Sequence, residues 1–367
     1  MKIIQVVLDL PPSICGVGDF AYNMSGMLGP RGIETRFLVC NPLWQGPYPG
    51  RVPPLKIKSM TARAFRDGAE NLASGIGRDR GITLLIHYVN YGYGKKGCPF
   101  WLVNGIERLK SLGEKYRLIT MFHEMYAAGS SWKPAYVFSP IHRYLAKKLS
   151  RASDFLITTA EEYARAAKLW SGRDTGTVSL PMPSNVGEPS KISPLSNRKK
   201  RMVIFGQQRR AVWRSSSLSE RLFRACSTLG LNEIVDIGED VPGAAHPRHT
   251  GITVRRMAPI PATDISLSSI LSESFAGYLH YESKFISKST VYAAYCAHGM
   301  LPVFYAEGPA TAGLTAGTLF LPARRGENVP GAGRLQEIAD NALTQYKTHD
   351  TRAWADMISA VVTGKGG

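Results

Sequence analysis

The sequence predicts two successive α/β domains, each a doubly wound parallel sheet covered by helices. A chain of 367 residues exceeds one compact core and fits two domains of about 150 to 200 residues each. Short apolar runs alternate with helical patterns through the first half, and the same alternation restarts after residue 200. Between the halves lies a Pro/Ser/Asn-rich stretch at 180–196, LPMPSNVGEPSKISPLS, followed by the basic run RKKR.

The first half carries the pattern of a parallel sheet. Strands are expected at 3–8, 35–40, 83–88, 118–123 and 155–159, and helices at 19–28, 62–74, 100–112, 140–149 and 160–170. These strands are nearly continuous apolar runs, which is typical of strands buried on both faces by helices.

The second half repeats the pattern. Strands are expected at 202–205, 233–237, 252–255, 275–281, 303–305 and 318–321, with helices at 217–229, 265–273, 289–298 and 335–346 and a terminal helix at 351–362. We therefore expect a first domain at 1–180, a linker at 181–200, a second domain at 201–348 and a C-terminal segment at 349–367.

Composition excludes several classes of protein. A hydrophobic content of 44% with 20% charged residues is typical of a globular protein rather than a disordered one. No apolar run approaches the roughly 20 residues that span a bilayer, and the N-terminal MKIIQVVLDLPPS is a better first strand than signal peptide. Five scattered cysteines favour a reducing compartment over a disulfide framework or zinc site, so we expect a cytoplasmic protein.

The net charge of +17 is concentrated in the first half. Residues 1–180 hold 24 Lys and Arg against 13 Asp and Glu, whereas residues 181–367 hold 21 against 15. A basic surface of this size attracts nucleic acid, anionic lipid or phosphorylated substrates and does not choose among them.

Ligands of doubly wound sheets bind beyond the carboxyl ends of the strands, so the residues after each strand are candidates. The first strand is followed by PPSICGVGDF, in which Gly16 and Gly18 let the backbone approach a ligand at the start of a helix that carries Asp19. The spacing is not G-x-G-x-x-G, which disfavours a nicotinamide dinucleotide. A tight strand-to-helix turn is the alternative interpretation.

A loop rich in tyrosine and glycine, HYVNYGYGKKG, follows the third strand. Tyr88, Tyr91 and Tyr93 suit stacking and hydrogen bonding to a sugar or another polar acceptor, although a long connection would have the same composition. After the fourth strand come His123 and Glu124, where an imidazole beside a carboxylate can hydrogen-bond a substrate hydroxyl or stabilise developing charge. A structural histidine is the alternative.

Two basic loops of the second half suit a pyrophosphate. Gly206 is followed by Arg209 and Arg210, whose guanidinium groups pair with phosphate oxygens in a bidentate manner, unless the loop is merely solvated. The segment GYLHYESKFISKSTVYAAYCAHGMLP at 277–302 reads as a strand, a basic loop and a helix. The anion pocket expected at that helix start combines the free amides, the helix dipole and four side chains: Lys284, Lys288, Ser289 and Thr290.

One helix has a basic face. In IHRYLAKKLSR at 141–151, Arg143, Lys147 and Arg151 recur at a spacing of four residues. Such a stripe either lies against an anionic membrane or is a solvated face.

Taken together, these residues resemble the retaining, nucleotide-sugar-dependent glycosyltransferases of family 4, which have the GT-B fold. The resemblance covers nearly the whole chain. It rests on four parts in order: the strand leading to Gly16-Val17-Gly18-Asp19, the strand ending in His123, the basic loop at Gly206, and the block from Glu282 to Pro302.

The resemblance implies an α/β GT-B protein of two Rossmann-like domains with a cleft between them. It implies an acceptor held by the first domain and a nucleotide-diphosphate sugar, as co-substrate, held by the second. No metal or cofactor is expected, and the terminal helix typically returns to the first domain. Arg209 and Lys288 would neutralise the diphosphate, with Ser289 and Thr290 adding contacts to it. His123 would face the transferred sugar, and Gly18 and Asp19 would lie near the sugar or acceptor.

The sequence departs from the family pattern at one position. The family has a second Glu eight residues after the first, which usually holds the nucleotide ribose, but eight residues after Glu282 stands Thr290. Three functions stay open. One is a retaining glycosyltransferase acting on a lipid-linked or polysaccharide-precursor acceptor, with the inner face of the membrane as one expected location. The others are a GT-B epimerase or inverting transferase, and a non-catalytic protein that binds nucleic acid or an anionic surface. No RNA-binding signature accompanies the charge, so nucleic acid is not the expected partner.

Overall fold

The structure is a computed structural model that describes residues 1–76, 81–113, 115–126, 137–172, 175–244, 251–307, 315–323 and 330–364. The chain divides into two compact units. The first unit comprises Met1–Pro181 together with Trp354–Gly367, and the second comprises Met182–Ala353.

The first unit is built on a parallel sheet of seven strands in the order β3-β2-β1-β4-β5-β6-β7. The strands are β1 (Lys2–Val7), β2 (Glu34–Val39), β3 (Leu55–Lys56), β4 (Ile82–Val89), β5 (Tyr116–Glu124), β6 (Phe155–Thr158) and β7 (Gly176–Ser179). The predicted doubly wound parallel sheet is therefore confirmed. The edge strands β3 and β7 were not predicted, because each is too short or too polar to give an apolar run.

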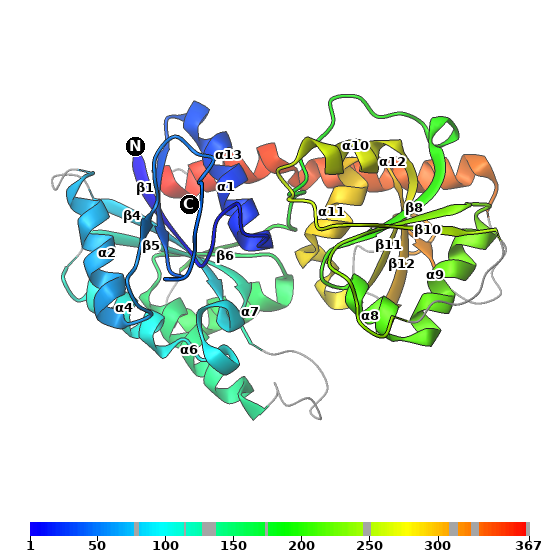
Figure 1. Ribbon diagram of the computed structural model, residues 1–367. Helices are drawn as coiled ribbons and strands as arrows, with labels where there is room; N and C mark the ends of the chain where they lie inside the picture. The colour runs from blue at the N-terminus through cyan, green and yellow to red at the C-terminus, as the bar shows by residue number, and fades with distance from the viewer. Residues whose placement is uncertain are drawn as a thin grey trace. The chain divides into compact units, whose positions relative to one another are not determined.

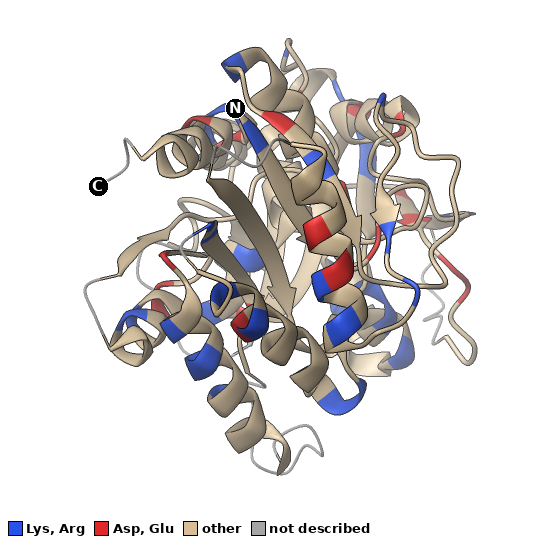
Figure 2. Ribbon diagram, turned by 90° about the vertical axis from the view of Figure 1, so that its left-hand side faces the viewer, with Lys and Arg blue, Asp and Glu red and all other residues tan. Residues whose placement is uncertain are grey.

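Helices cover both faces of this sheet. They are α1 (Gly16–Leu28), α2 (Ala62–Ser74), α3 (Asn90–Tyr93), α4 (Phe100–Lys110), α6 (Ser139–Ala152), α7 (Glu161–Ser171) and α13 (Thr351–Thr363). Figure 1 shows α2, α4 and α6 on one face and α1 and α13 on the other. The side of this unit seen in Figure 2 carries more Lys and Arg than Asp and Glu along its helices.

The last helix is held on the first unit by aromatic contacts. The ring of Trp354 meets that of Phe20 edge to face at 5.1 Å, and its indole donates a hydrogen bond to the carbonyl of Pro181 at 2.7 Å. Arg31, at the end of the turn after α1, forms an ion pair with Asp356 at 2.6 Å. Helix α13 thus covers α1 on the face opposite α4.

The second unit has a parallel sheet of six strands in the order β10-β9-β8-β11-β12-β13. The strands are β8 (Lys199–Phe205), β9 (Glu233–Ile237), β10 (Thr253–Met257), β11 (Ser274–Glu282), β12 (Leu301–Glu307) and β13 (Leu321–Pro322). The helices are α8 (Arg209–Arg214), α9 (Ser216–Thr228), α10 (Ile265–Glu273), α11 (Thr290–Ala297) and α12 (Ala332–Tyr346). This unit confirms the second predicted sheet.

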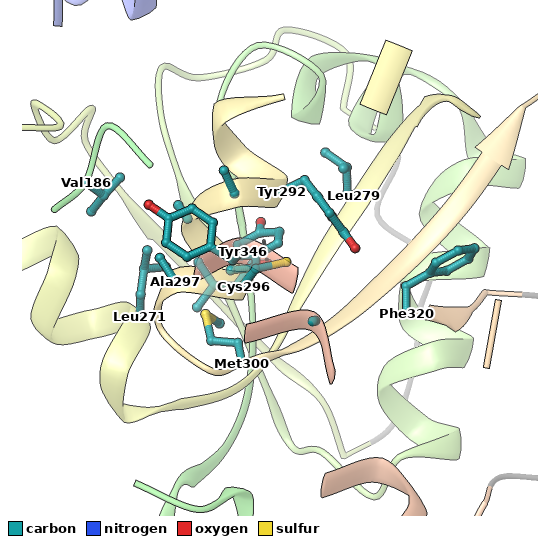
Figure 3. Packing of buried hydrophobic residues seen from close by; sticks show 14 of the residues in the cluster. Val186, Leu271, Leu279, Tyr292, Cys296, Ala297, Met300, Phe320 and Tyr346 are labelled. Atoms are coloured by element: carbon teal, nitrogen blue, oxygen red, sulfur yellow. Dashed lines mark hydrogen bonds between the residues drawn. The ribbon is translucent and has the colours of Figure 1, made fainter. Parts of the chain in front are cut away.

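Helix α11 lies inside the second core. Its residues from Tyr292 to Ala297 are all buried, as expected of a helix that is apolar all round. Figure 3 shows this helix packed among Leu271 of α10, Leu279 of β11 and Tyr346 of α12. Because so little of α11 reaches solvent, its N-terminus is held at a fixed place on the sheet.

The segment expected as a linker, 181–200, packs largely onto the second unit. The guanidinium of Arg198 is buried and donates to the backbone carbonyls of Ser193, Ser274 and His298, the closest contact being 2.7 Å. Burial lowers the pKa of Arg198 to about 10. An ionised side chain therefore fastens this proline-rich segment to the core, a role that composition alone does not reveal.

Within the described parts of the chain, none of the helices is long and apolar enough to cross a membrane. No group of three or more His, Cys, Asp or Glu side chains among those same residues is arranged to hold a metal ion.

Candidate functional site

Each sheet has one topological switch point, where the strand order reverses. It lies between β1 and β4 in the first unit and between β8 and β11 in the second. Ligands of doubly wound sheets bind beyond the carboxyl ends of the strands at this point. The residues predicted from sequence cluster around these two places.

In the second unit, the predicted helix start is a well-formed N-terminus. Ser289 is the N-cap of α11, and its hydroxyl accepts a hydrogen bond from the amide of Tyr292 at 3.1 Å. The first residue of the helix is Thr290, which follows the short 3₁₀ helix Ser283–Lys288. The cap uses the serine hydroxyl, so at this terminus the groups suited to an anion are the remaining free amides and the helix dipole.

Gly206 lies next to this helix start. It has a positive φ of 81°, and a Cβ added there would lie 2.7 Å from Cγ2 of Val291 in the first turn of α11. Glycine is required for both reasons, since other residues rarely adopt this backbone conformation and the helix leaves no space. The β8 loop and the α11 N-terminus, predicted separately to bind phosphate, are thus adjacent.

Arg209 and Arg210, which the sequence predicts to bind phosphate, begin α8 and are paired with acidic residues in this structure. The guanidinium of Arg209 is 3% exposed and forms an ion pair with Asp236 at 3.3 Å, and it donates to the carbonyl of Glu239. Arg210 pairs with the carboxylate of Glu239. Arg209 lies so close to Gly238 that a Cβ added to this glycine would overlap its guanidinium. Both side chains therefore hold the end of β9 in place. An anion could bind either guanidinium group only by displacing the carboxylate of Asp236 or Glu239.

The two lysines of the 3₁₀ helix share one aromatic partner. The ammonium groups of Lys284 and Lys288 lie 4.8 Å and 5.0 Å from the ring centre of Phe285, which is buried. Lys284 also lies 4.0 Å from the carboxylate of Glu282, at the end of β11. The lysines thus flank the loop that leads into α11, with Lys288 two residues before Thr290.

In the first unit, Gly16, Gly18 and Asp19 form the first turn of α1. A Cβ on Gly18 would lie 2.3 Å from the carbonyl oxygen of Asp9, so this glycine is needed to pack the helix against the preceding loop. Asp19 is 5% exposed, and burial raises its pKa to about 7. A carboxyl group that is half ionised near neutral pH is suited to proton transfer.

His123 is the last residue but one of β5 and lies beside a second histidine that was not assigned a role from the sequence. Its Nε2 lies 3.2 Å from Nδ1 of His87 on β4, and Nε2 of His87 lies 2.7 Å from Oε1 of Gln5 on β1. The ladder between β4 and β5 shifts register after Tyr88, which makes His123 an extra residue in β5. Such bulges redirect a side chain at the end of a strand.

Phe20 of α1 covers this pair of histidines. Its ring meets those of His87 and His123 edge to face at 5.8 Å and 5.9 Å. The helix that carries Asp19 is therefore packed directly onto the face of the sheet that carries His123.

Only one of the three predicted tyrosines is available at the surface. Tyr88 and Tyr93 are buried, and the hydroxyl of Tyr93 donates to the carbonyl of Val6 at 3.3 Å. Tyr91 is 43% exposed, and partial burial, followed by the negative charges of Glu124 and Cys98, raises its pKa. The expectation of an exposed tyrosine loop is thus corrected, because Tyr88 and Tyr93 are core residues. Tyr91 and the half-buried Glu124, whose charge acts on the Tyr91 hydroxyl, remain at the carboxyl ends of β4 and β5.

The residues that sequence reasoning missed are polar side chains inside apolar strands. Gln5 interrupts the apolar run of β1, and Asp236 interrupts that of β9. A polar residue in a strand that is buried on both faces needs a partner, and that signal was available in the sequence. The identity of that partner could not be read from the sequence.

The basic helix α6 keeps its stripe exposed. Arg143, Lys147 and Arg151 all face solvent, and Leu145 and Leu149 are buried. A groove of about 1060 Å³ lies elsewhere on the first unit, along α1 and the beginning of β2, with Tyr22, Thr35 and Tyr48 in its lining. It contains none of the residues predicted from sequence.

Comparison with known proteins shows the fold and leaves the family open. No protein-family model matches the chain, and no curated protein matches its sequence. Three similar solved structures are a sucrose-phosphate synthase from Thermosynechococcus elongatus, an alpha-glucosyltransferase in complex with UDP, and HepE of Anabaena in complex with UDP-glucose.

These similarities extend over complete chains at low sequence identity. The TM-scores are 0.67, 0.61 and 0.61, with identities of 11%, 11% and 12%, in the same order. The matches cover 99%, 98% and 99% of this chain and 98%, 98% and 100% of the other chains. This chain therefore has the two-sheet α/β fold of the GT-B glycosyltransferases, as the sequence resemblance implied.

Proposed function

We propose that the protein is a glycosyltransferase that moves a sugar from a nucleotide-diphosphate donor to a hydroxyl acceptor. The observation that carries the proposal is the contact between the Gly206 loop and the start of α11 at the β8/β11 switch point. Two backbone segments suited to phosphate meet there, and the fold is that of enzymes which include structures with UDP or UDP-glucose bound.

The second unit would bind the donor through charge rather than through a metal. Lys288 would approach the diphosphate, with Ser289 and Thr290 at the helix start and Lys284 and Glu282 beside the loop. Thr290 would contact the ribose in place of a carboxylate. Fixed amides and one or two ammonium groups stabilise the charge that develops on a leaving diphosphate.

Arg209 and Arg210 would bind the diphosphate of the nucleotide sugar only after leaving their present acidic partners. Their pairing with Asp236 and Glu239 means that binding of a diphosphate would exchange one anionic partner for another. Exchange costs less than burying a new unpaired charge, because each guanidinium keeps an anionic partner throughout.

The first unit would bind the acceptor near the end of β5. His123 would face the transferred sugar, and Asp19 would lie close enough to exchange a proton with an acceptor hydroxyl. Gly16, Tyr91 and Glu124 would complete the acceptor surface. We propose retention of anomeric configuration by front-face attack, with the leaving diphosphate oxygen helping to deprotonate the acceptor. The proton NMR spectrum of the product distinguishes this from an inverting transferase or an epimerase.

The donor site is tested by thermal unfolding with UDP-, GDP-, ADP- and TDP-sugars. A ligand present at 100 times its Kd stabilises the native state by about 2.7 kcal/mol, which raises Tm by about 5 to 10 °C for a unit of this size. We expect Lys288→Ala to lose the shift. Lys347→Ala is the matched control, since Lys347 is an exposed lysine in another 3₁₀ helix of the same unit. The proposal fails if no nucleotide sugar shifts Tm.

The exposed basic stripe of α6, formed by Arg143, Lys147 and Arg151, supports a peripheral location at the inner face of an anionic membrane. A lipid-linked or polysaccharide-precursor acceptor would be bound there. Cosedimentation with vesicles that contain anionic lipid tests this location. We expect wild type to bind and Arg143→Glu with Lys147→Glu to be released, because each reversal replaces an attraction with a repulsion. If both proteins remain in solution, the acceptor is not delivered by this surface.

The second candidate is a protein that binds a polyanion without catalysis. The net charge of +17 favours it, and the alpha-glucosyltransferase similarity includes a complex with DNA. A gel-shift titration with DNA and RNA across salt concentrations separates the two. Binding to nucleic acid together with an unchanged Tm in every nucleotide sugar would favour this alternative.

A further inference from the structure

Four polar side chains form a continuous hydrogen-bonded chain through the first sheet. The amide Nε2 of Gln5 lies 3.3 Å from the hydroxyl of Thr35, and Oε1 of Gln5 lies 2.7 Å from Nε2 of His87. Nδ1 of His87 then lies 3.2 Å from Nε2 of His123. The four residues come from the adjacent strands β2, β1, β4 and β5.

The register of the parallel strands explains the alignment. Thr35 pairs with Ile3, and Gln5 lies two residues further along β1. Gln5 pairs with Leu85, and His87 lies two residues further along β4. Steps of two keep every side chain on the same face of the sheet and move it toward the carboxyl edge. The row of hydrogen-bonded side chains therefore crosses the sheet diagonally and ends at His123.

Packing alone does not account for these polar groups. Gln5 and His87 are fully buried, and the neighbouring residues of β1 are isoleucine and valine. A buried amide or imidazole contributes less to stability than an aliphatic side chain, unless its hydrogen bonds are made. Here those bonds connect to one another and end at the candidate site.

The chemistry of each group fixes the direction of the hydrogen bonds. A carbonyl oxygen such as Oε1 of Gln5 only accepts, so Nε2 of His87 must carry the proton between them. Burial lowers the pKa of His87 to about 3, so its ring is neutral near neutral pH and Nδ1 bears a lone pair. Nε2 of His123 faces that lone pair and must therefore donate.

We propose that Gln5 and His87 are positioning residues that fix the ring proton of His123 on Nε2. Nδ1 of His123 is then the ring atom that bears the lone pair and can accept a hydrogen bond. The orientation also allows His123 to become protonated, since His87 still accepts from Nε2–H in either state. The part of this inference that concerns substrate rests on the proposed glycosyltransferase function.

The tautomers are measured by nitrogen NMR of the full chain with isotopically labelled histidine. Signals are assigned by comparison with His87→Phe and His123→Asn. We expect both His87 and His123 to carry the proton on Nε2 in the wild-type protein. In His87→Phe, which keeps an aromatic ring beside Phe20, we expect His123 to become a mixture of tautomers. A wild-type His123 with its proton on Nδ1, or an unchanged tautomer in His87→Phe, would overturn the proposal.

Two further variants keep the test decisive. Gln5→Met retains the volume of the side chain and removes the acceptor, so it should release the tautomers of both histidines even where His87→Phe fails to fold. Thr120→Val is the matched control, because Thr120 lies on β5 and its buried hydroxyl bonds to Ser153 at 2.8 Å, outside this chain. It should lower Tm and leave both tautomers as in wild type. A tautomer change in Thr120→Val would show that general loosening of the core is responsible.

Kinetics separate this inference from the proposed function. We expect Gln5→Met to reduce kcat by about 10- to 100-fold, the loss typical when the outer partner of a metal-bound imidazole is removed, with KM for the donor unchanged. An altered tautomer with unchanged kcat would overturn the positioning role. Absence of transfer by the wild-type protein would overturn the glycosyltransferase function, and the tautomer measurement would still stand.

Discussion

Replacing Asp19 with asparagine should make the first unit more stable at pH 8. The carboxyl group is 5% exposed, and burial raises its pKa from 3.8 to about 7. Folding thus places an ionisable group where its charged form is disfavoured. Asparagine has nearly the same shape and cannot ionise, so it removes this cost and keeps the hydrogen-bonding capacity.

The magnitude follows from the pKa difference. A rise of about 3 pKa units corresponds to about 4 kcal/mol between the protonated and ionised forms, and this is an upper value for the effect of the substitution. The folded-state pKa is above the unfolded value, so the folded state binds more protons between about pH 4 and pH 7. The free energy of unfolding therefore falls as pH rises through this window, and the full penalty is present above pH 7.

Calorimetry at pH 4 and pH 8 measures this effect. We expect Asp19→Asn and wild type to unfold at nearly the same Tm at pH 4. At pH 8 the variant should unfold up to about 16 °C higher, because 1 kcal/mol shifts Tm by about 2 to 4 °C for a unit of this size. Asp67→Asn is the control, since Asp67 is an exposed carboxylate on α2. It should change Tm little at either pH.

The same variant links stability to function. If Asp19 exchanges a proton with the acceptor, Asp19→Asn should reduce kcat by about 10²- to 10⁴-fold while raising Tm. A group that costs stability and supports activity is the pattern expected of a functional site. The reasoning is refuted if Asp19→Asn is less stable than wild type at pH 8, or if the two proteins show the same dependence of Tm on pH.

Three other substitutions test how the candidate site is held. Gly206→Ala should destabilise the second unit by about 1 to 3 kcal/mol and weaken the Tm shift caused by nucleotide sugars, because the added methyl group clashes with α11 and the φ is unfavourable. Gly230→Ala is the control. Gly230 has a φ of 63° and open space around it, so this variant should show only the smaller cost of backbone strain. Arg198→Met should lower the urea midpoint of that unit by leaving buried carbonyls unpaired, at a cost of about 3 kcal/mol, and an unchanged midpoint would contradict this role. Trp354→Ala should destabilise the first unit by about 3 to 5 kcal/mol and expose α13 to protease, whereas protection equal to wild type would show that the Phe20 contact is dispensable.

Several elements could be predicted because their signals are local. The apolar runs that became β1, β4 and β11 gave both the strands and their parallel arrangement, since strands covered on both faces need no polar alternation. The start of α11 could be predicted from serine and threonine ahead of an apolar helix. Gly206 was recognised for its place after a strand, and the contact with Val291 gives it a second reason.

Other parts of the site could not be predicted, because they depend on partners far away in the sequence. Arg209 is predicted to bind phosphate, and the structure adds a partner that the sequence did not reveal, Asp236, 27 residues further on. Tyr93 was expected to contact an acceptor, but its side chain is buried and its hydroxyl donates to the carbonyl of Val6, 87 residues earlier. The identity of a residue determines which bonds its side chain can make. It does not determine which partner lies close to that side chain in the folded protein.

The amino-acid sequence alone was enough to predict two doubly wound sheets and the strand ends where ligands of such sheets bind. Hydrophobic periodicity and helix caps are properties of neighbouring residues, so they can be read without a structure. Which polar groups face one another depends on the folded arrangement of the strands. The register of four parallel strands aligns Thr35, Gln5, His87 and His123 on one face, and burial decides the ionisation of Asp19. Both arise from contacts between distant segments, which exist only once the chain has folded.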